Sequence, residues 1–262
     1  MTEPHIDWDP GTYQRFRGLR LRPALDLLLQ VGEVPEGTVV DLGCGDGAVA
    51  GPLRARFPGQ RVLGVDSSPA MVAEAQGYDA TRLADIAHWV PEEMPAVIFS
   101  NAALHWVPHH EVLFPRLAAA LADGGVLAVQ MPRQFDAPSH RLLRDLAEGM
   151  YPDRFHFGDY VAPVAPPGAY HRLLDPVGEV RLWETEYLQV LAPVEDGHPV
   201  RAFTQATALR PFAARMGEGE LQDFVATYDE ALAIAYPAEA DGTVLFPFRR
   251  LFLILTRDGE AG

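Results

Sequence analysis

Short apolar runs alternate with helical segments along the first half of the chain. The runs cover residues 39–42, 61–66, 96–100 and 126–130, and helix-like stretches such as 110–121 lie between them. Each run is apolar at successive positions, as in strands that are buried on both faces. Strands of this kind alternating with helices predict a parallel sheet with helices on both sides.

The second half of the chain has a different pattern. Residues 139–150 are predicted to be helical, residues 151–168 read as a loop rich in proline and glycine, and 180–191 alternates like a strand. A mostly helical stretch, 200–236, precedes a last apolar strand within 243–256. The predicted fold class is α/β: a Rossmann-like, doubly wound, mostly parallel sheet of about seven strands with helices on both faces, plus a helical cap.

The same pattern predicts four segments along the chain. Helices inserted between two late strands are expected to form a cap rather than to extend the sheet. We expect an N-terminal helical cap segment, an α/β core, a helical cap insertion, and a final core strand with a tail, at residues 1–30, 31–191, 192–242 and 243–262.

Composition narrows the classes of function. The chain has 262 residues, 48% of them hydrophobic and 22% charged, which suits one sizeable domain and excludes global disorder. Its 21 basic and 36 acidic residues give a net charge of −15, which opposes binding to a phosphate backbone. We therefore expect no nucleic-acid partner.

Cysteine and lysine usage exclude further chemistry. Cys44 is the only cysteine, no apolar run approaches the roughly 18 residues of a membrane helix, and the N-terminus is acidic and polar. These features predict a soluble cytoplasmic protein with no membrane partner. Every basic residue is arginine, so Schiff-base and pyridoxal phosphate chemistry, the phosphate-loop lysine and the Tyr/Lys pair of short-chain dehydrogenases are excluded.

A glycine-rich segment stands at the predicted junction of the first strand and first helix. It reads Asp41-Leu-Gly43-Cys44-Gly45-Asp-Gly47, and its glycines let the backbone come close to a ligand. Read as G-x-G-x-x-A, the segment also fits a dinucleotide turn. The carboxylate of Asp41 favours a cationic ligand, because a pyrophosphate would be repelled there. D-x-G-x-G-x-G is typical of S-adenosylmethionine-dependent methyltransferases.

Later polar residues fit the same cofactor. Asp66 ends the second apolar run and is placed to bind ribose hydroxyls, Asp85 an adenine amino group, and Asn101 the methionine portion. For Asp66 and Asp85 the alternative is a helix N-cap. Arg20 or Arg22 could hold the cofactor's carboxylate, with helix capping or surface pairing as the alternative. The expected cofactor-binding set is Arg22, Asp41, Gly43, Cys44, Gly45, Asp66, Ser67, Met71, Asp85, Ile86 and Asn101.

Motifs along most of residues 8–257 resemble one family within this class. They are the stretches at 8–28, 65–71, 100–108, 125–132 and 209–211, with 236–237, 241–242 and 245–252. Together they are similar to the trans-aconitate 2-methyltransferases. The resemblance implies methyl transfer from S-adenosyl-L-methionine to a carboxylate oxygen of a small tricarboxylic acid, with S-adenosyl-L-homocysteine as the second product.

Several positions depart from the pattern of that family. His105 stands where a glutamine is usual, Ala208 where a glycine is usual, and Arg249 replaces a proline. Glu184 stands where a basic residue often occurs, and 195–198 looks like an insertion. The acceptor therefore stays open between trans-aconitate and another small molecule, such as a malonyl thioester or a natural-product acid or hydroxyl.

The chemistry expected of the site needs no catalytic residue. A carboxylate with a pKa near 4 is already a nucleophile at neutral pH, so the protein has to supply positioning only. Arginines and aromatic walls are expected to hold the acceptor, although salt bridging and core packing are their alternatives. The expected acceptor-binding residues are Tyr13, His105, Trp106, Tyr187, Arg210 and Arg250. No metal is expected at His109-His110-Glu111, because adjacent histidines point to different sides.

Two other classes of function remain open from the sequence. A nicotinamide-dependent oxidoreductase could use the Gly43-Gly45-Ala48 turn, although Asp41 and the absence of lysine count against it. A cofactor-binding subunit without an acceptor pocket would share the glycine segment. The oligomeric state and the methylated oxygen do not follow from the sequence.

Overall fold

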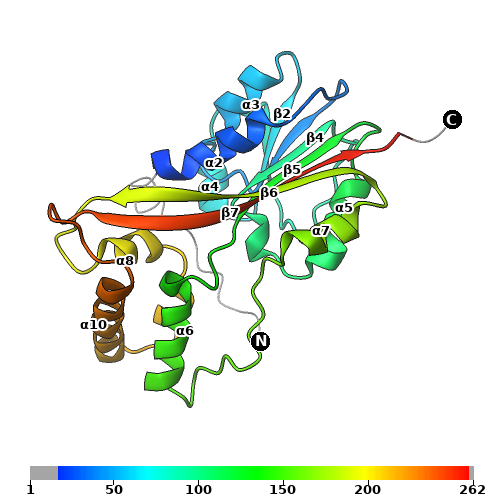
Figure 1. The fold of residues 1–262 in the computed structure, drawn as a ribbon. Helices are drawn as coiled ribbons and strands as arrows, with labels where there is room; N and C mark the ends of the chain where they lie inside the picture. Colours follow the sequence, from blue (N-terminus) through cyan, green and yellow to red (C-terminus); the bar gives the residue numbers. More distant parts are fainter. Residues whose placement is uncertain (1–16, 260–262) are drawn as a thin grey trace. The chain divides into compact units, whose positions relative to one another are not determined.

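The computed structural model describes residues 17–259, and their side chains from residue 21 onward. Within this part of the chain the strands form one seven-stranded sheet of order β3-β2-β1-β4-β5-β7-β6 (Figure 1). β1 to β5 run parallel, and β7 is antiparallel to β5. The strands are β1 (Val39–Leu42), β2 (Val62–Asp66), β3 (Ala80–Leu83), β4 (Val97–Asn101), β5 (Val126–Pro132), β6 (Gly178–Leu191) and β7 (Val244–Arg257). The predicted α/β fold with a mostly parallel sheet is confirmed.

The helices agree with the sequence pattern except at residues 167–174, where a helix stands that this pattern does not predict. They are α2 (Arg17–Leu29), α3 (Ala50–Arg56), α4 (Pro69–Glu74), α5 (His110–Ala119), α6 (Pro138–Met150), α7 (Pro167–Leu174), α8 (Pro199–Thr204), α9 (Arg210–Ala213) and α10 (Glu218–Ala235). A short 3₁₀ helix, Leu104–Trp106, follows β4. Among the described residues, no helix has the length and apolar character required to cross a membrane.

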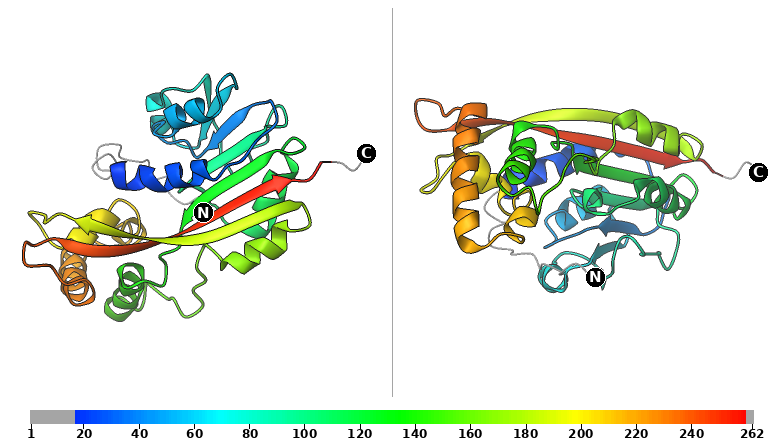
Figure 2. Two further views of the ribbon diagram at one scale, coloured as in Figure 1. Left: turned by 45° about the horizontal axis from the view of Figure 1, so that its top comes forward. Right: turned by 90° about the horizontal axis from the view of Figure 1, so that it is seen from below.

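The chain divides into two compact units. The first consists of Met1–Pro132, Pro163–Thr185 and Arg250–Gly262, and the second of Arg133–Ala162 and Glu186–Arg249. In the first unit, α2 and α3 lie on one side of the parallel strands and α5 and α7 on the other (Figure 2). The second unit holds α6, α8, α9 and α10.

Apolar residues of the parallel strands form the core of the first unit. Val39, Val97 and Val126 are fully or almost fully buried and lie side by side in register. Alternation is absent from these strands because helices cover both faces, which is why the sequence shows unbroken apolar runs. Ser100 is a polar exception, and its hydroxyl donates to the carbonyl of Leu42 at 2.7 Å.

Aromatic side chains and one buried serine hold the second unit together. Phe212 stacks on Phe224, and Phe224 stacks on Tyr228, with ring centroids 6.1 and 6.4 Å apart. Ser139 joins α6 to the end of α10: its carbonyl accepts from the hydroxyl of Tyr228 at 2.6 Å, and its amide donates to that of Tyr236 at 3.1 Å.

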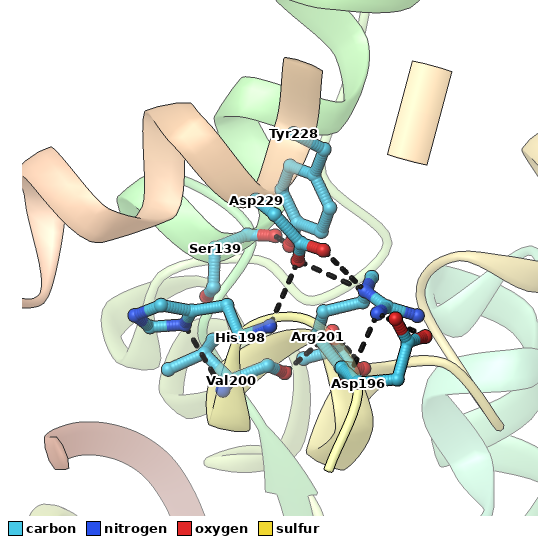
Figure 3. A network of polar contacts seen from close by, with 8 residues as sticks. Ser139, Asp196, His198, Val200, Arg201, Tyr228 and Asp229 are labelled. Carbon is cyan, nitrogen blue, oxygen red and sulfur yellow. Dashed lines mark hydrogen bonds and ion pairs between the residues drawn. The ribbon is translucent and has the colours of Figure 1, made fainter. Parts of the chain in front are cut away.

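An ion-pair network around the nearly buried Arg201 lies in the same unit, with Asp229 mostly buried and Asp196 exposed (Figure 3). The Arg201 guanidinium donates to both carboxylate oxygens of Asp229 and to that of Asp196, each at 2.9 Å. His198 accepts from the amide of Val200 through Nδ1, so its Nε2 carries the proton donated to the carbonyl of Tyr236. Asp196 and His198 both belong to the predicted insertion at 195–198, which therefore supplies contacts to α8 and α10.

Candidate active site

The glycine-rich segment forms a tight turn after β1. Gly43, Gly45 and Gly47 adopt left-handed backbone angles, with φ of 86°, 53° and 88°. The amides of Gly43 and Cys44 both donate to the carbonyl of Val65, at 2.8 and 3.0 Å, which ties the turn to β2. A Cβ on Gly43 would lie 2.1 Å from that of Ala103, whereas a Cβ on Gly45 would meet nothing within 4 Å. The turn is therefore packed beneath Gly43 and open at Gly45.

Asp66, at the end of β2, supports this turn. Its Oδ2 accepts from the amide of Gly45 and its Oδ1 from the amide of Ser68, both at 2.9 Å. Ser68 is the N-cap of α4, with Pro69 at the first helical position. Asp66 is thus not the cap of that helix. Each carboxylate oxygen keeps a lone pair for a further donor.

Ser67 and Met71 flank Asp66 on the way into α4. Ser67 is exposed beside Asp66, and Met71 is buried in the first turn of the helix, where its amide donates to the hydroxyl of Ser68 at 3.3 Å. Ser67 therefore presents a hydroxyl to solvent at the carboxyl edge of the sheet, while Met71 packs inward.

Asp41 lies beneath the turn rather than on its surface. Its side chain is buried, and its Oδ2 accepts from the hydroxyl of Tyr78 at 2.6 Å. Burial raises the pKa of Asp41 to about 7, with a smaller upward contribution from Asp66, while the bond from Tyr78 lowers that pKa. Gly64 pairs with Asp41 across the strands, and a Cβ there would lie 2.9 Å from the Tyr78 ring. Burial also raises the pKa of the Cys44 thiol.

Asp85 and Ile86 follow β3. The carboxylate of Asp85 accepts from the amide of Ala87 at 2.9 Å and lies 3.2 Å from Nδ1 of His88, so it closes its own turn. The sequence left a helix N-cap as the alternative, but a turn and no helix follows Asp85. Ile86 is buried, and its Cδ1 would lie 3.5 Å from a Cβ on Gly43, which places it against the glycine turn.

Asn101 ends β4 at the same edge of the sheet. The next residue, Ala102, has a φ of 53°, so the chain turns sharply after Asn101. Within the described residues, the buried Oδ1 of Asn101 has no hydrogen-bond partner. A buried acceptor in this state suits a ligand that brings a donor.

The 3₁₀ helix after β4 carries His105 and Trp106. Their rings lie 4.6 Å apart, and the Trp106 side chain is about half exposed. His110 braces this helix by contacting the carbonyl of Leu104 through Nε2 at 2.9 Å and the hydroxyl of Tyr170 through Nδ1 at 2.6 Å. Burial lowers the pKa of His110. Among the described residues, no group of three or more His, Cys, Asp or Glu side chains could hold a metal ion.

Arg250 lies in β7, two strands from Asn101. Its side chain is 4% exposed, and its Nη1 donates to Oε1 of Gln130 in β5 at 3.2 Å. Gln130 is fully buried and pairs in register with Asn101 on one side and Phe252 on the other. Because residues paired in register share a face of the sheet, Gln130 and Asn101 point to the same side.

The remaining predicted residues belong to other elements of the chain or fall outside its described part. Arg22 is exposed on α2, with its Nε 3.9 Å from Asp26. Tyr187 and Arg210 belong to the second compact unit, on β6 and at the start of α9. Tyr13 lies outside the described residues.

The first unit therefore gathers most of the predicted cofactor residues at one edge of its sheet, and two further residues there were not predicted. Gln130 ends an apolar run just as Asn101 does, so the same signal could have identified it. Tyr78 carries no such signal, since it reaches Asp41 from a loop 37 residues along the chain.

Comparisons with known proteins agree with this architecture. Residues 13–210 match the model of a methyltransferase domain family. The chain is 43% identical to the trans-aconitate 2-methyltransferase of Methylobacterium nodulans, over 96% of this chain and 98% of that protein. It is 41% identical to the protein of the same name from Klebsiella pneumoniae, over 95% of this chain and 97% of that protein.

A solved structure shares the fold. The YcgJ protein of Bacillus subtilis superposes with a TM-score of 0.55 at 14% identity, covering 91% of this chain and all of that one. The predicted family is confirmed by the extent and level of the sequence identity. On these grounds, the chain belongs to the trans-aconitate 2-methyltransferase family of methyltransferases.

Proposed function

We propose that this protein is an S-adenosyl-L-methionine-dependent O-methyltransferase that esterifies a carboxylate of a small polycarboxylic acid, trans-aconitate first. The observation that carries the proposal is the Asp66 carboxylate, which bridges the amides of Gly45 and Ser68 beside open space at Gly45. Relatives more than 40% identical over nearly the whole chain, named for trans-aconitate, support the acceptor.

The residues of the glycine turn fit this cofactor. Gly45 leaves room for a ligand, Asp66 retains lone pairs for ribose hydroxyls, and the buried Oδ1 of Asn101 suits an ammonium group. Asp85 and Ile86 would border the adenine. The residues proposed to hold the cofactor are Arg22, Asp41, Gly43, Cys44, Gly45, Asp66, Ser67, Met71, Asp85, Ile86 and Asn101.

The proposed reaction requires the protein to position its two reactants and requires no catalytic residue. When bound, S-adenosyl-L-methionine supplies an electrophilic methyl group and leaves as S-adenosyl-L-homocysteine. The acceptor carboxylate is ionised at neutral pH, so no residue has to remove a proton. The protein has to align the acceptor oxygen with the methyl group and exclude water, which can lower a barrier by about 7–11 kcal/mol.

Cationic and aromatic residues are proposed to bind the acceptor. A polyanion approaching a protein of net charge −15 needs a local positive group, and Arg250 is a buried one. His105 and Trp106 stand on the 3₁₀ helix that follows Asn101. Tyr13, Tyr187 and Arg210 complete the proposed set, and residues 192–242 are proposed to act as a helical cap, with 1–30 as a second cap segment.

The setting of the enzyme is also a proposal. Cys44 is the only cysteine, so it cannot form an internal disulfide, and the chain carries a net charge of −15. These features support action in the cytoplasm on a small acid, without a nucleic-acid partner.

The experiment that tests this function is methyl transfer from labelled S-adenosyl-L-methionine to trans-aconitate, with cis-aconitate, citrate and isocitrate assayed in parallel. Turnover selective for trans-aconitate is expected. Turnover only of another acid or hydroxyl compound would replace the acceptor and keep the reaction. Binding of S-adenosyl-L-homocysteine without turnover of any acceptor would indicate a non-catalytic subunit, and binding of a nicotinamide dinucleotide in its place would overturn the cofactor.

A further inference from the structure

Two side-chain amides, each with one buried polar atom, lie next to each other at the carboxyl edge of the sheet. Asn101 and Gln130 pair in register on β4 and β5. Within residues 17–259, Oδ1 of Asn101 and Nε2 of Gln130 have no hydrogen-bond partner. The first atom is an acceptor and the second a donor, and leaving either one buried without a partner is unfavourable. Both atoms therefore suit a ligand.

Arg250 fixes which end of the Gln130 amide is available. A guanidinium only donates hydrogen bonds, so the amide atom 3.2 Å from its Nη1 must be the oxygen. The amide nitrogen, with two N–H groups, consequently points away from Arg250. Gln130 is fully buried, so water does not compete for these donors at its surface.

We propose that Gln130 is a specificity-determining residue whose amide N–H groups, oriented by Arg250, bind a carboxylate of the methyl acceptor. This inference rests on the proposed function and deepens it, because it names the group that recognises the acid. Two N–H donors beside a buried cation favour an anionic oxygen over a hydroxyl group.

The neighbouring Asn101 offers a hydrogen-bond acceptor where Gln130 offers donors. Its Oδ1 accepts and so suits the ammonium of the cofactor's methionine portion, whereas Gln130 donates and suits the acceptor's anion. Adjacent strands are about 4.8 Å apart, so the two amides place a cationic and an anionic reactant side by side. Methyl transfer to a carboxylate requires the cationic cofactor and the anionic acceptor to lie next to each other.

Gln130→Leu and Gln130→Glu test the proposal, with Gln60→Leu and Gln60→Glu as matched controls. Gln60 also has a buried Oε1 without a described partner, but it lies before β2, at the opposite edge of the sheet. Its Nε2 donates to the carbonyl of Pro35 at 3.3 Å. Steady-state kinetics with trans-aconitate and calorimetry with S-adenosyl-L-homocysteine are measured for each variant, and thermal unfolding confirms that each is folded.

Gln130→Leu is expected to raise KM for trans-aconitate by about 10- to 100-fold, because it removes donors to a charged group. Gln130→Glu should raise KM further, since the new carboxylate would pair with Arg250 and repel the acid. The affinity of both Gln130 variants for S-adenosyl-L-homocysteine should stay within about threefold of wild type. In both Gln60 variants, KM for trans-aconitate and this affinity should stay within the same limit. An unchanged KM in both Gln130 variants, or a parallel loss of S-adenosyl-L-homocysteine binding, would overturn the proposal.

A second measurement separates this inference from the proposed function. If the wild type does not turn over trans-aconitate, the four acids are titrated calorimetrically into its complex with S-adenosyl-L-homocysteine. Binding of an acid by wild type that Gln130→Leu abolishes would support the inference while the proposed acceptor fails. Binding that survives the substitution, or no binding of any acid by wild type, would overturn it.

Discussion

The hydroxyl of Tyr78 donates to the buried carboxylate of Asp41 at 2.6 Å, from a loop that follows α4 to a strand beneath the glycine turn. The pair is possible because Gly64, opposite Asp41, leaves space for the Tyr78 ring. A carboxylate in the D-x-G-x-G-x-G segment is therefore an internal support of the turn, and its protonation is coupled to folding.

Asp41 should make stability depend on pH. Burial raises its pKa from 3.8 to about 7, so between these values the folded protein holds a proton that the unfolded chain releases. The contribution of Asp41 to the free energy of unfolding therefore falls as pH rises through this window. The free energy of unfolding of Asp41→Asn lacks this fall. Its difference from the wild-type value should therefore change in favour of the variant by on the order of 2 kcal/mol between pH 5 and pH 8, measured by urea denaturation.

Tyr78→Phe serves as the companion variant for that prediction. The Tyr78 bond lowers the pKa of Asp41, so its removal should move the pH-dependent window upward. Identical pH profiles for wild type and Asp41→Asn would show that Asp41 does not titrate in this range.

Gly43 should tolerate a side chain less well than another glycine with similar backbone angles. Gly43 and Gly59 have φ of 86° and 84°, but only a Cβ on Gly43 would clash, at 2.1 Å from that of Ala103. Gly59→Ala should cost about 1 kcal/mol from its left-handed backbone alone. Gly43→Ala should cost about 1–3 kcal/mol more through overpacking. Equal losses in urea denaturation would contradict the packing argument.

Asp66 should govern cofactor affinity. The Asp66 carboxylate accepts hydrogen bonds from the amides of Gly45 and Ser68, and we expect it to accept from the ribose hydroxyls. Asp66→Asn removes its negative charge, so binding of S-adenosyl-L-homocysteine should weaken about 10- to 100-fold. Asp46→Asn, in the same turn, removes an equal charge without these bonds and should bind nearly as wild type. Isothermal calorimetry measures the affinity of both variants for S-adenosyl-L-homocysteine. An equal loss of affinity in the two variants would indicate an effect of local charge and not a specific contact of Asp66.

Arg201 should be essential to the stability of the second unit. Its guanidinium is nearly buried against Asp229, which is 20% exposed, so Arg201→Met would leave Asp229 unpaired at a cost of about 3–5 kcal/mol. Arg141→Met removes an exposed partner of Asp145 on α6 and should cost about 0.5 kcal/mol or less. Comparable losses in urea denaturation would mean that burial does not strengthen the Arg201 pairs.

Local patterns were sufficient for the parallel half of the fold and for the glycine turn. Apolar runs without alternation follow from burial on both faces, and Ser68 with Pro69 marks the start of α4 through capping chemistry that needs only neighbouring residues. Asp66 and Asn101 were identifiable because polar residues that end apolar strands meet at one edge of a parallel sheet.

Other relationships depend on strand order and on distant contacts. The sequence alone determined the α/β class, the glycine turn with Asp66, and the family to which the chain belongs. The three-dimensional structure was needed to find that Tyr78 supports Asp41, that Asp85 closes its own turn, and that Gln130 lies between Asn101 and Arg250. These contacts join residues through the order of the strands and the fold of a loop, and neither periodicity nor capping encodes which strand lies beside which.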